Sequence, residues 1–386
     1  MPDRKDDVIM SATDLSFELE DLIEGLRKWV EIESPTFDAV AVERMADHAA
    51  FELAKAGAKV ERIHGRDGLG GSVLARFPHP RAGEQGIMFS GHLDTVHPLG
   101  SLKKNPWRRE DGKLYGPGVH DMKGGIFLAI EAMRRLKEAG IETALPVTFL
   151  LTPDEEIGSP TSRDLIEAEA RKNKYVIVGE PCLSDNAAVI GRYAIARFNL
   201  QTRGRPSHAG WALKEGRSAI SEMARRIPEI EGMTTEDTTY SVGVIAAGEW
   251  VNCVPATCNA ELLSMAKTQE YLDHGVDALM KLQGIRNDVE FIVNRGCWRP
   301  VWSPGQAEDL ALFDLARPIA ARAGIDLRHE PSGGGSDGNF TGALGIATLD
   351  STGPRGAGLH TLQEFVFEDS LIERARFHAG LFAELA

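Results

Sequence analysis

Two apolar runs without a charged residue constrain the fold of this chain more than any other feature. Residues 146–152 have the sequence P-V-T-F-L-L-T and residues 175–178 have the sequence Y-V-I-V. Continuous apolar runs of this length are typical of strands buried on both faces, as in a parallel sheet covered by helices. Helical periodicity at 126–139 and 309–323 alternates with such runs. The pattern predicts an α/β fold with a mostly parallel sheet flanked by helices.

The segments before the first of these runs fit the same architecture. Apolar residues recur at helical spacing, and short apolar runs follow. We predict helices at 15–32 and 39–56, strands at 71–77 and 86–89, and a last helix at 370–386.

The pattern changes after Pro181, where alternating strands and helices continue to about residue 295. Strands are predicted at 194–202, 240–247 and 289–293, and helices at 218–227 and 271–282. This stretch predicts a smaller open-sheet α+β domain inserted into the first one. The predicted boundaries are 1–187 and 305–386 for the larger domain and 188–304 for the insertion.

Charge and cysteine content exclude several kinds of partner. The 386 residues hold 43 Lys and Arg against 57 Asp and Glu, a net charge of −14, which argues against a broad nucleic-acid or anionic-membrane surface. No apolar run approaches the roughly 18 residues of a membrane helix, and residues 1–14 lack the features of a secretory signal. The four cysteines form no C-x-x-C pair. We expect a cytoplasmic protein with no nucleic-acid or membrane partner.

Polar residues with metal-binding chemistry follow the predicted strands. Ligands of α/β sheets bind outside the carboxyl ends of the strands. These positions hold Ser90-Gly91-His92-Leu93-Asp94 after 87–89, Asp154-Glu155-Glu156 after 146–151, and Gly179-Glu180 after 175–178.

Two glycine-rich segments add further groups of the same kind. Asp121 lies within residues 116–125, and His360 ends the segment 356–360. Histidine and carboxylate ligands without cysteine suit zinc or a similar divalent metal in a catalytic site. A pair of metals about 3.5–4 Å apart needs a bridging carboxylate and a nearby acid that holds the attacking water. The sequence holds enough groups for such a site.

Five motifs resemble one enzyme family. They are G-H-L-D-T-V (91–96), G-P-G-V-H-D-M-K-G-G (116–125), D-E-E-I-G (154–158), G-E-P (179–181) and G-L-H (358–360). In this order they resemble the di-zinc amidohydrolases and metallopeptidases that include glutamate carboxypeptidase, acetylornithine deacetylase, succinyl-diaminopimelate desuccinylase and the aminoacylases. G-H-L-D-T-V-H-P and G-G-G-S-D-G-N (333–339) most resemble the glutamate carboxypeptidase branch.

The resemblance implies two divalent metal ions per subunit, with zinc expected and cobalt or manganese as alternatives. Asp121 would bridge the ions, with His92 and Glu180 on one ion and Glu156 and His360 on the other.

The resemblance also implies the catalytic groups around the metals. Asp94 would orient the imidazole of His92 and fix its tautomer. Glu155 would be the general base that generates the metal-bridging hydroxide and then protonates the leaving nitrogen.

The inserted domain carries a second part of the resemblance, which implies a lid and dimerisation role. His208 in S-H-A-G (207–210) would reach the partner subunit's active site and stabilise the oxyanion, so a homodimer is expected. Asn252 in N-x-V-P would contact the substrate or the oxyanion. Outside this predicted insertion, the glycine run at 333–335, with Gly334 and Gly335, would let the backbone lie close to the substrate.

Two positions depart from the family pattern. Met265 stands where an arginine usually grips the substrate carboxylate, and Arg299 is the remaining cation in a matching region. Carboxylate recognition rests on Arg299 alone, or the substrate lacks the usual α-carboxylate. His120 precedes Asp121 where small or aromatic residues are commoner, and it lines the pocket or fills space. For His97 we expect a capping or packing role.

The predicted function is metal-dependent hydrolysis of an amide bond in a small N-acyl amino acid or dipeptide-like substrate, as in glutamate carboxypeptidases. One alternative is deacylation of an N-acyl amino acid, or hydrolytic deamination of a small amino-aromatic acid, on the same metals. A second alternative is a catalytically inactive metal-containing binding protein, against which the intact Glu155 argues.

Overall fold

The computed structural model describes residues 11–183 and 186–386, which form two compact units. The first unit contains the described residues up to Gly191, together with Pro304–Pro331 and Ser336–Ala386. The second contains Arg192–Ser303 and Ser332–Gly335. The division therefore differs from the predicted 188–304 by a few residues, and it places residues 332–335 with the insertion.

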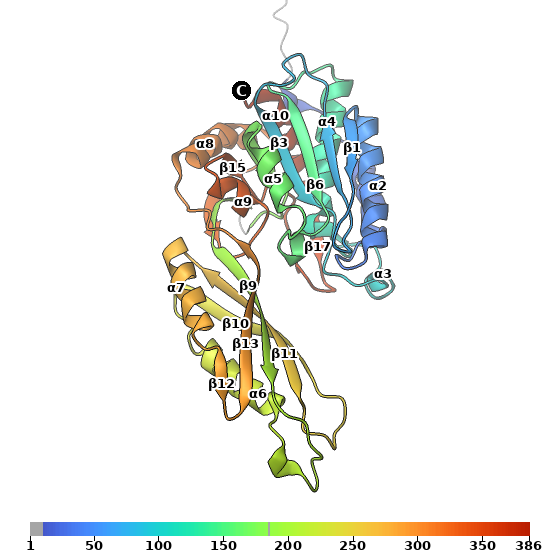
Figure 1. Ribbon diagram of the computed structural model, residues 1–386. Coiled ribbons are helices and arrows are strands. Elements are labelled where there is room, and N and C mark those ends of the chain that lie inside the picture. The colour runs from blue at the N-terminus through green and yellow to red at the C-terminus, as the bar shows by residue number, and fades with distance from the viewer. Residues whose placement is uncertain (1–10, 184–185) are drawn as a thin grey trace, which may run out of the picture. The chain divides into compact units, whose positions relative to one another are not determined.

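The first unit contains most of the helices and a central sheet (Figure 1). Its helices are α1 (Leu19–Val30), α2 (Ala39–Ala56), α3 (Ser101–Lys104), α4 (Gly124–Glu138), α5 (Arg163–Ala170), α8 (Ala307–Arg322), α9 (Gly338–Ala343) and α10 (Asp369–Glu384). The sheet strands are β1 (Lys59–Ile63), β2 (Ser72–Arg76), β3 (Gly86–His92), β6 (Val147–Thr152), β7 (Asn173–Val178) and β15 (Ala347–Leu349). A smaller sheet contains β4 (Arg108–Glu110), β5 (Lys113–Tyr115), β16 (Gly356–Ala357) and β17 (Phe365–Phe367), and β8 (Ala187–Arg192) pairs with β14 (Arg328–Ser332).

The central sheet is mostly parallel, as predicted. Its strand order is β1-β2-β6-β3-β7-β15, and β6, β3, β7 and β15 pair in parallel, whereas β2 is antiparallel to β6 and to β1. His92 pairs with Thr152, and Ser90 pairs with Val178. The segments that follow β3, β6 and β7 therefore leave the sheet at the same edge.

Helices cover both faces of this sheet, which explains why its strands are apolar throughout. On one face, α5 and α9 pack against Met88, Leu150 and Val176. On the other face, Phe89 and Phe149 contact Phe382 of α10, and α10 packs against α4 (Figure 1). Every residue of β3 and β6 is buried.

The first ninety residues differ from the prediction at one helix boundary and by one additional strand. The first helix begins at Leu19 rather than at residue 15, because Leu15 and Phe17 are buried in the stretch that precedes it. The strand β1 was not predicted, because it is a short, half-exposed edge strand without an apolar run.

The second unit is an open antiparallel sheet with two helices on one face. Its elements are β9 (Ala194–Arg203), β10 (Thr238–Ala247), β11 (Thr257–Ala266), β12 (Gly284–Arg286), β13 (Val289–Arg299), α6 (Ala219–Glu231) and α7 (Gln269–Met280). The strand order is β10-β11-β9-β13-β12. Burial alternates along β9 and β11, and their buried side chains pack against Met223 of α6 and Leu272 of α7. The open-sheet α+β prediction is confirmed.

No helix among the described residues is long and apolar enough to cross a membrane.

Candidate metal centre

Five residues from separate segments meet at the carboxyl edge of the central sheet. His92 ends β3, Glu180 lies two residues after β7, and Glu156 lies in a short 3-10 turn (Glu155–Ile157) after β6. Asp121 lies in the turn Val119–Lys123 before α4, and His360 lies in the loop between β16 and β17. The peptide bond between Asp121 and Met122 is cis.

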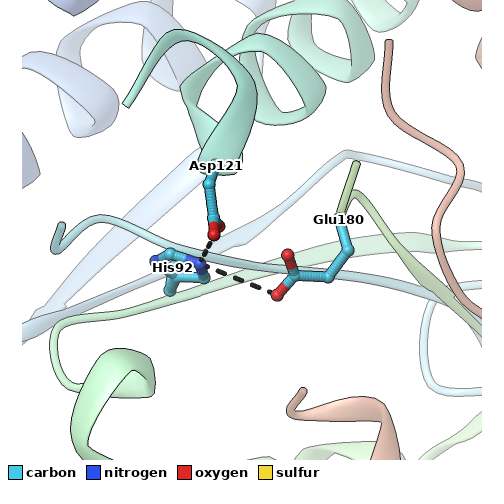
Figure 2. Close-up of side chains that lie close together, drawn as sticks. All are labelled: His92, Asp121 and Glu180. Carbon is cyan, nitrogen blue, oxygen red and sulfur yellow. Dashed lines mark hydrogen bonds and ion pairs between the residues drawn. The ribbon is translucent and has the colours of Figure 1, made fainter. Parts of the chain in front are cut away.

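The first cluster of these residues consists of His92, Asp121 and Glu180. Nε2 of His92 lies 3.0 Å from Oδ1 of Asp121 and 3.6 Å from Oε1 of Glu180 (Figure 2). One nitrogen and two carboxylate oxygens thus converge on a common point.

The second cluster consists of Asp121, Glu156 and His360. Nε2 of His360 lies 3.1 Å from Oδ2 of Asp121 and 3.3 Å from Oε2 of Glu156. Asp121 belongs to both clusters and turns one carboxylate oxygen toward each histidine. This geometry would suit a carboxylate shared by two cations.

Asp94 holds this arrangement from behind His92. Nδ1 of His92 lies 2.9 Å from the main-chain oxygen of Asp94 and 3.4 Å from its carboxylate. Because a carbonyl oxygen can only accept, this nitrogen carries the hydrogen, and Nε2 of the neutral ring keeps a lone pair for a metal. The main-chain oxygen of Asp94 is therefore closer to the ring than the carboxylate that sequence analysis singled out.

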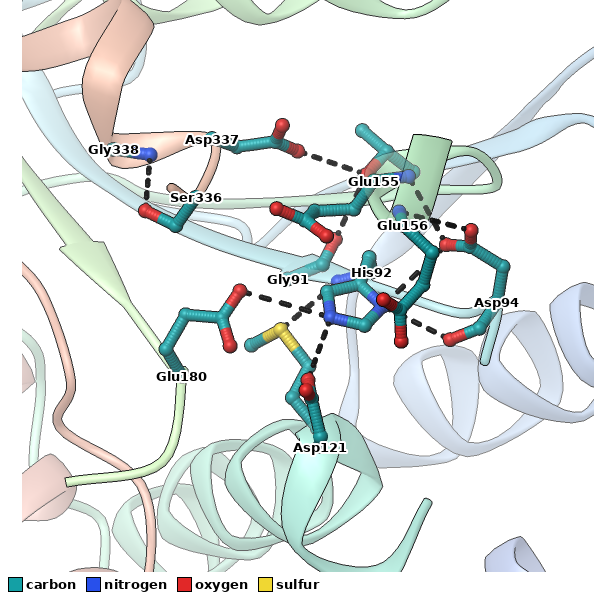
Figure 3. A network of polar contacts seen from close by, with 12 residues as sticks. Gly91, His92, Asp94, Asp121, Glu155, Glu156, Glu180, Ser336, Asp337 and Gly338 are labelled. Carbon is teal, nitrogen blue, oxygen red and sulfur yellow. Dashed lines mark hydrogen bonds and ion pairs between the residues drawn. The ribbon is translucent and has the colours of Figure 1, made fainter. Parts of the chain in front are cut away.

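The carboxylate of Asp94 has a second role that the sequence did not predict. It accepts a hydrogen bond from the hydroxyl of Thr36 at 2.8 Å. It also accepts hydrogen bonds from the backbone N–H groups of Glu155 and Glu156 at 3.2 and 3.3 Å (Figure 3). One buried side chain therefore links the strand that carries His92 to the turn that carries both glutamates.

The proton affinities of the clustered groups are strongly shifted. Burial lowers the pKa of His92, but hydrogen bonds with Asp121 and Asp94 outweigh it and hold the pKa well above its ordinary value. Hydrogen bonds with Asp121 and Glu156 raise the pKa of His360 to about 10. Burial opposes ionisation of Asp121, yet the contacts with His360 and His92 keep its pKa below the usual range.

The two glutamates of the clusters shift in the opposite direction. Burial, together with the negative charge of Asp121, raises the pKa of Glu156 and raises that of Glu180 more strongly. Carboxylates gathered in this way favour a bound cation, since positive charge would relieve both burial and repulsion. With imidazole nitrogens and carboxylate oxygens as donors, the residues fit a pair of divalent ions of the zinc type.

Glu155 is buried next to the first cluster. Its charge acts on both His92 and Glu180 and favours a proton on each. Its side chain lies beside the clusters in Figure 3, while its neighbour Glu156 faces His360.

His208 and Asn252 belong to the second unit and lie on two neighbouring antiparallel segments. His208 forms a β-bridge with Cys253, and the N–H of Ala209 donates to the carbonyl of Asn252 at 2.8 Å. The backbone N–H groups of Gly210 and Trp211 donate to Nδ1 of His208 at 3.1 and 3.4 Å. A neutral His208 therefore carries its hydrogen on the exposed Nε2, where it can donate.

The remaining predicted substrate residues also lie in the second unit. Arg299 is buried, and a Cβ atom on Gly335 would lie 2.8 Å from its Cδ. Nη1 of Arg192 donates to the carbonyl of Gly334 at 2.9 Å. The glycine run is thus packed against two buried arginines, one of which, Arg192, sequence analysis missed. Met265 lies half-buried on β11.

Two further buried residues lie near Asp121: Glu364, which the sequence did not single out, and His120, for which it left open lining the pocket or filling space. Glu364 accepts the backbone N–H groups of Gly118, His120 and Asp121, and it contacts Nε2 of His97 at 2.7 Å. Only the proximity of Glu364 to His360 in sequence could have drawn attention to it. His120 itself is buried with Nε2 3.1 Å from the carbonyl of Pro354.

Comparison with known proteins identifies the class of this chain. The profile of peptidase family M20/M25/M40 matches residues 88–384. Carboxypeptidase G2 of Pseudomonas sp. (strain RS-16) is 31% identical over 398 residues, covering 98% of this chain and 91% of that protein. Succinyl-diaminopimelate desuccinylase of Bordetella avium (strain 197N) is 28% identical over 317 residues, covering 75% and 81%.

Solved structures share the fold at lower identity. The aminopeptidase PepT of Bacillus cereus matches with a TM-score of 0.71 at 23% identity, covering 95% of this chain and 99% of that one. The M20 family metallo-carboxypeptidase Sso-CP2 of Sulfolobus solfataricus matches with a TM-score of 0.71 at 17% identity, covering 96% and 99%.

The chain therefore belongs to peptidase family M20/M25/M40. It is a metal-dependent peptidase or amidohydrolase that uses divalent metal.

Proposed function

We propose that this protein hydrolyses the amide bond of a small N-acyl amino acid or dipeptide-like substrate, in the manner of a carboxypeptidase, on two zinc ions. The observation that carries this proposal is Asp121, whose two oxygens face two histidine–carboxylate clusters. His92 and Glu180 would hold one ion, and Glu156 and His360 the other.

The chain's own residues supply the proton transfers. When bound, the ions polarise the scissile carbonyl and make water acidic enough to ionise near neutral pH. Glu155 takes the proton from the attacking water and returns it to the departing nitrogen. Asp94 supports this step because it holds both His92 and the backbone of Glu155.

His208 and Asn252 complete the proposed machinery. The hydrogen on Nε2 of His208 suits a donor to the developing oxyanion. Asn252, bonded through its carbonyl to the residue after His208, would contact the substrate or the same oxyanion.

We propose that His208 acts on the partner subunit of a homodimer. The strand β10 is an edge of its sheet, and its second half exposes Val244 and Ile245. Trp211 and Trp250 are also exposed, at 84% and 71%. An exposed apolar edge strand of this kind is suited to pairing with another chain.

The identity of the substrate is tested by the product released. Zinc-loaded protein is offered N-acyl-glutamates, other N-acyl amino acids and small amino-aromatic acids, and free glutamate, acyl acid and ammonia are measured. Faster release of glutamate from N-acyl-glutamates than of any product from the other substrates supports the carboxypeptidase proposal. Faster release of acetate from other N-acetyl amino acids, or of ammonia from amino-aromatic acids, favours the alternatives that Met265 leaves open, because a methionine cannot bind a carboxylate through charge.

An inactive binding protein is the remaining alternative. It would hydrolyse none of these amides when metal-loaded, and Glu155→Ala would bind the same ligands as the wild type. Turnover that is lost in Glu155→Ala excludes it.

The shared active site is tested by mixing two inactive variants. If His208 acts in trans, His208→Ala and Glu155→Ala subunits together form heterodimers with one intact site. Random exchange should restore about a quarter of wild-type activity in a twofold dimer. Mixtures that stay inactive after subunit exchange would remove the trans assignment.

A further inference from the structure

Glu364 is a fully buried carboxylate with four hydrogen-bonding contacts to the metal-site loop and its surroundings. Its Oε1 accepts the backbone N–H groups of His120 and Asp121 at 2.8 and 2.9 Å. Its Oε2 accepts the N–H of Gly118 at 2.9 Å and lies 2.7 Å from Nε2 of His97. None of its surface is exposed.

The loop that Glu364 holds departs from helical backbone geometry at Asp121. Asp121 has φ −112° and ψ 98°, which are not helical values, and Gly118 has φ 72°. Backbone N–H groups that converge in such a turn form a concave site for an anion. Here the anion is the side chain of Glu364, which directly precedes β17 and lies four residues after His360.

We propose that Glu364, supported by His97, is the positioning residue that aims the Asp121 carboxylate at both metal ions. This inference rests on the proposed di-metal function. Glu364 binds the N–H of Asp121 itself, so displacement of that contact moves the backbone that carries the shared ligand. It also ties the loop of Asp121 to the segments of the two histidine ligands, since His97 follows His92 and Glu364 follows His360.

The arrangement explains why a carboxylate is needed at position 364. A neutral amide offers one acceptor oxygen and one N–H donor pair, so at least one buried backbone N–H would lose its acceptor. Outer contacts of this type typically change metal affinity or activity about 10–100-fold when they are removed.

The test uses Glu364→Gln with a matched control, Asp309→Asn. Asp309 is a buried carboxylate in the same unit that accepts the backbone N–H of Thr348 at 2.9 Å. Metal-stripped proteins are titrated with Co²⁺, and the visible absorption of the bound ion is recorded together with thermal unfolding of the metal-free protein.

Wild type and Asp309→Asn should bind two Co²⁺ ions with the same affinity and spectrum. Glu364→Gln should bind Co²⁺ about 10–100-fold more weakly with an altered absorption band, because the shared ligand is misdirected. His97→Leu, which leaves the three backbone contacts of Glu364 in place, should shift in the same direction by less.

Three outcomes overturn the inference. The first is wild-type affinity and spectrum in Glu364→Gln, which leaves the proposed function standing. The second is an equal loss in Asp309→Asn, which marks general destabilisation. The third applies if Glu364→Gln does not fold, and it is Co²⁺ binding by His97→Leu that equals that of the wild type. A wild type that binds no Co²⁺ instead refutes the proposed function itself.

Discussion

The two clusters around Asp121 differ in how firmly the fold holds them. In the first cluster, His92 ends a fully buried strand, and 1% of its side chain is exposed. In the second, His360 lies on a loop with φ 62°, and 54% of its side chain is exposed. A ligand on a packed strand is fixed before the metal arrives, whereas a ligand on an open loop is ordered by the metal. We therefore expect the first site to bind its ion more tightly than the second.

The strongest way to break this comparison is to remove the residue that both clusters share. Asp121→Ala should lose both ions and at least about 10³-fold in kcat/KM, since metal activation supplies several kcal/mol of transition-state stabilisation. Metal analysis after dialysis measures the bound ions, and turnover assays measure kcat/KM. One tightly held ion per subunit in Asp121→Ala would mean that the sites do not depend on a common ligand.

A second change separates the chemistry from metal holding. Glu155→Gln should lower kcat by roughly 10²–10⁴-fold, because it removes the general base. Co²⁺ titration should still give two ions, as the clusters themselves are intact. Loss of an ion in this variant would show that Glu155 is a ligand instead.

The two clusters are compared most directly by the variants His92→Ala and His360→Ala. His360→Ala should keep one ion and lower the unfolding temperature of the metal-free protein less than His92→Ala does, because the lost side chain is half-exposed and leaves no buried cavity. His92→Ala should also lower the unfolding temperature of the metal-free protein, since it leaves a cavity beneath buried Asp94. Calorimetry and metal analysis of both variants measure the unfolding temperatures and the bound ions. Equal losses in the two variants would contradict the proposed difference between the clusters.

The smallest expected effect is a pH dependence of the metal-free protein. The pKa of His360 is raised to about 10 in the folded state by its carboxylate partners, against 6.5 as the ordinary value. Its protonation therefore stabilises the fold fully below about pH 6.5, and this contribution is lost as the pH rises toward 10. The difference in unfolding temperature between wild type and His360→Ala should shrink across that window. Metal affinity should rise over the same range, as protons compete for the ligand. A difference that is independent of pH would contradict the shift.

Much of the proposed site could be predicted because its candidate ligands follow recognisable strands and glycine-rich segments. The apolar runs before His92, Glu155 and Glu180 predict buried parallel strands, and parallel strands end at one edge of the sheet. The same reasoning could not predict a role for Glu364. A glutamate before a three-residue strand looks like a surface residue in sequence, and only its contacts with Gly118 and His97 in the folded chain distinguish it.

The placement of the glycine run shows a different limit. The chain returns to the first unit after residue 303, and sequence pattern alone gives no sign that residues 332–335 belong to the second. Their contacts include Arg192 and Arg299, which are more than thirty residues away in sequence.

The sequence by itself determined the fold class, the family and the residue types available for metal binding, because periodicity and local motifs are properties of neighbouring residues. Only the tertiary structure decided that Asp121 divides its oxygens between two histidines and that Asp94 and Glu364 hold the surrounding backbone. Those contacts join segments up to 246 residues apart. Their energy depends on burial and direction, which no local pattern encodes.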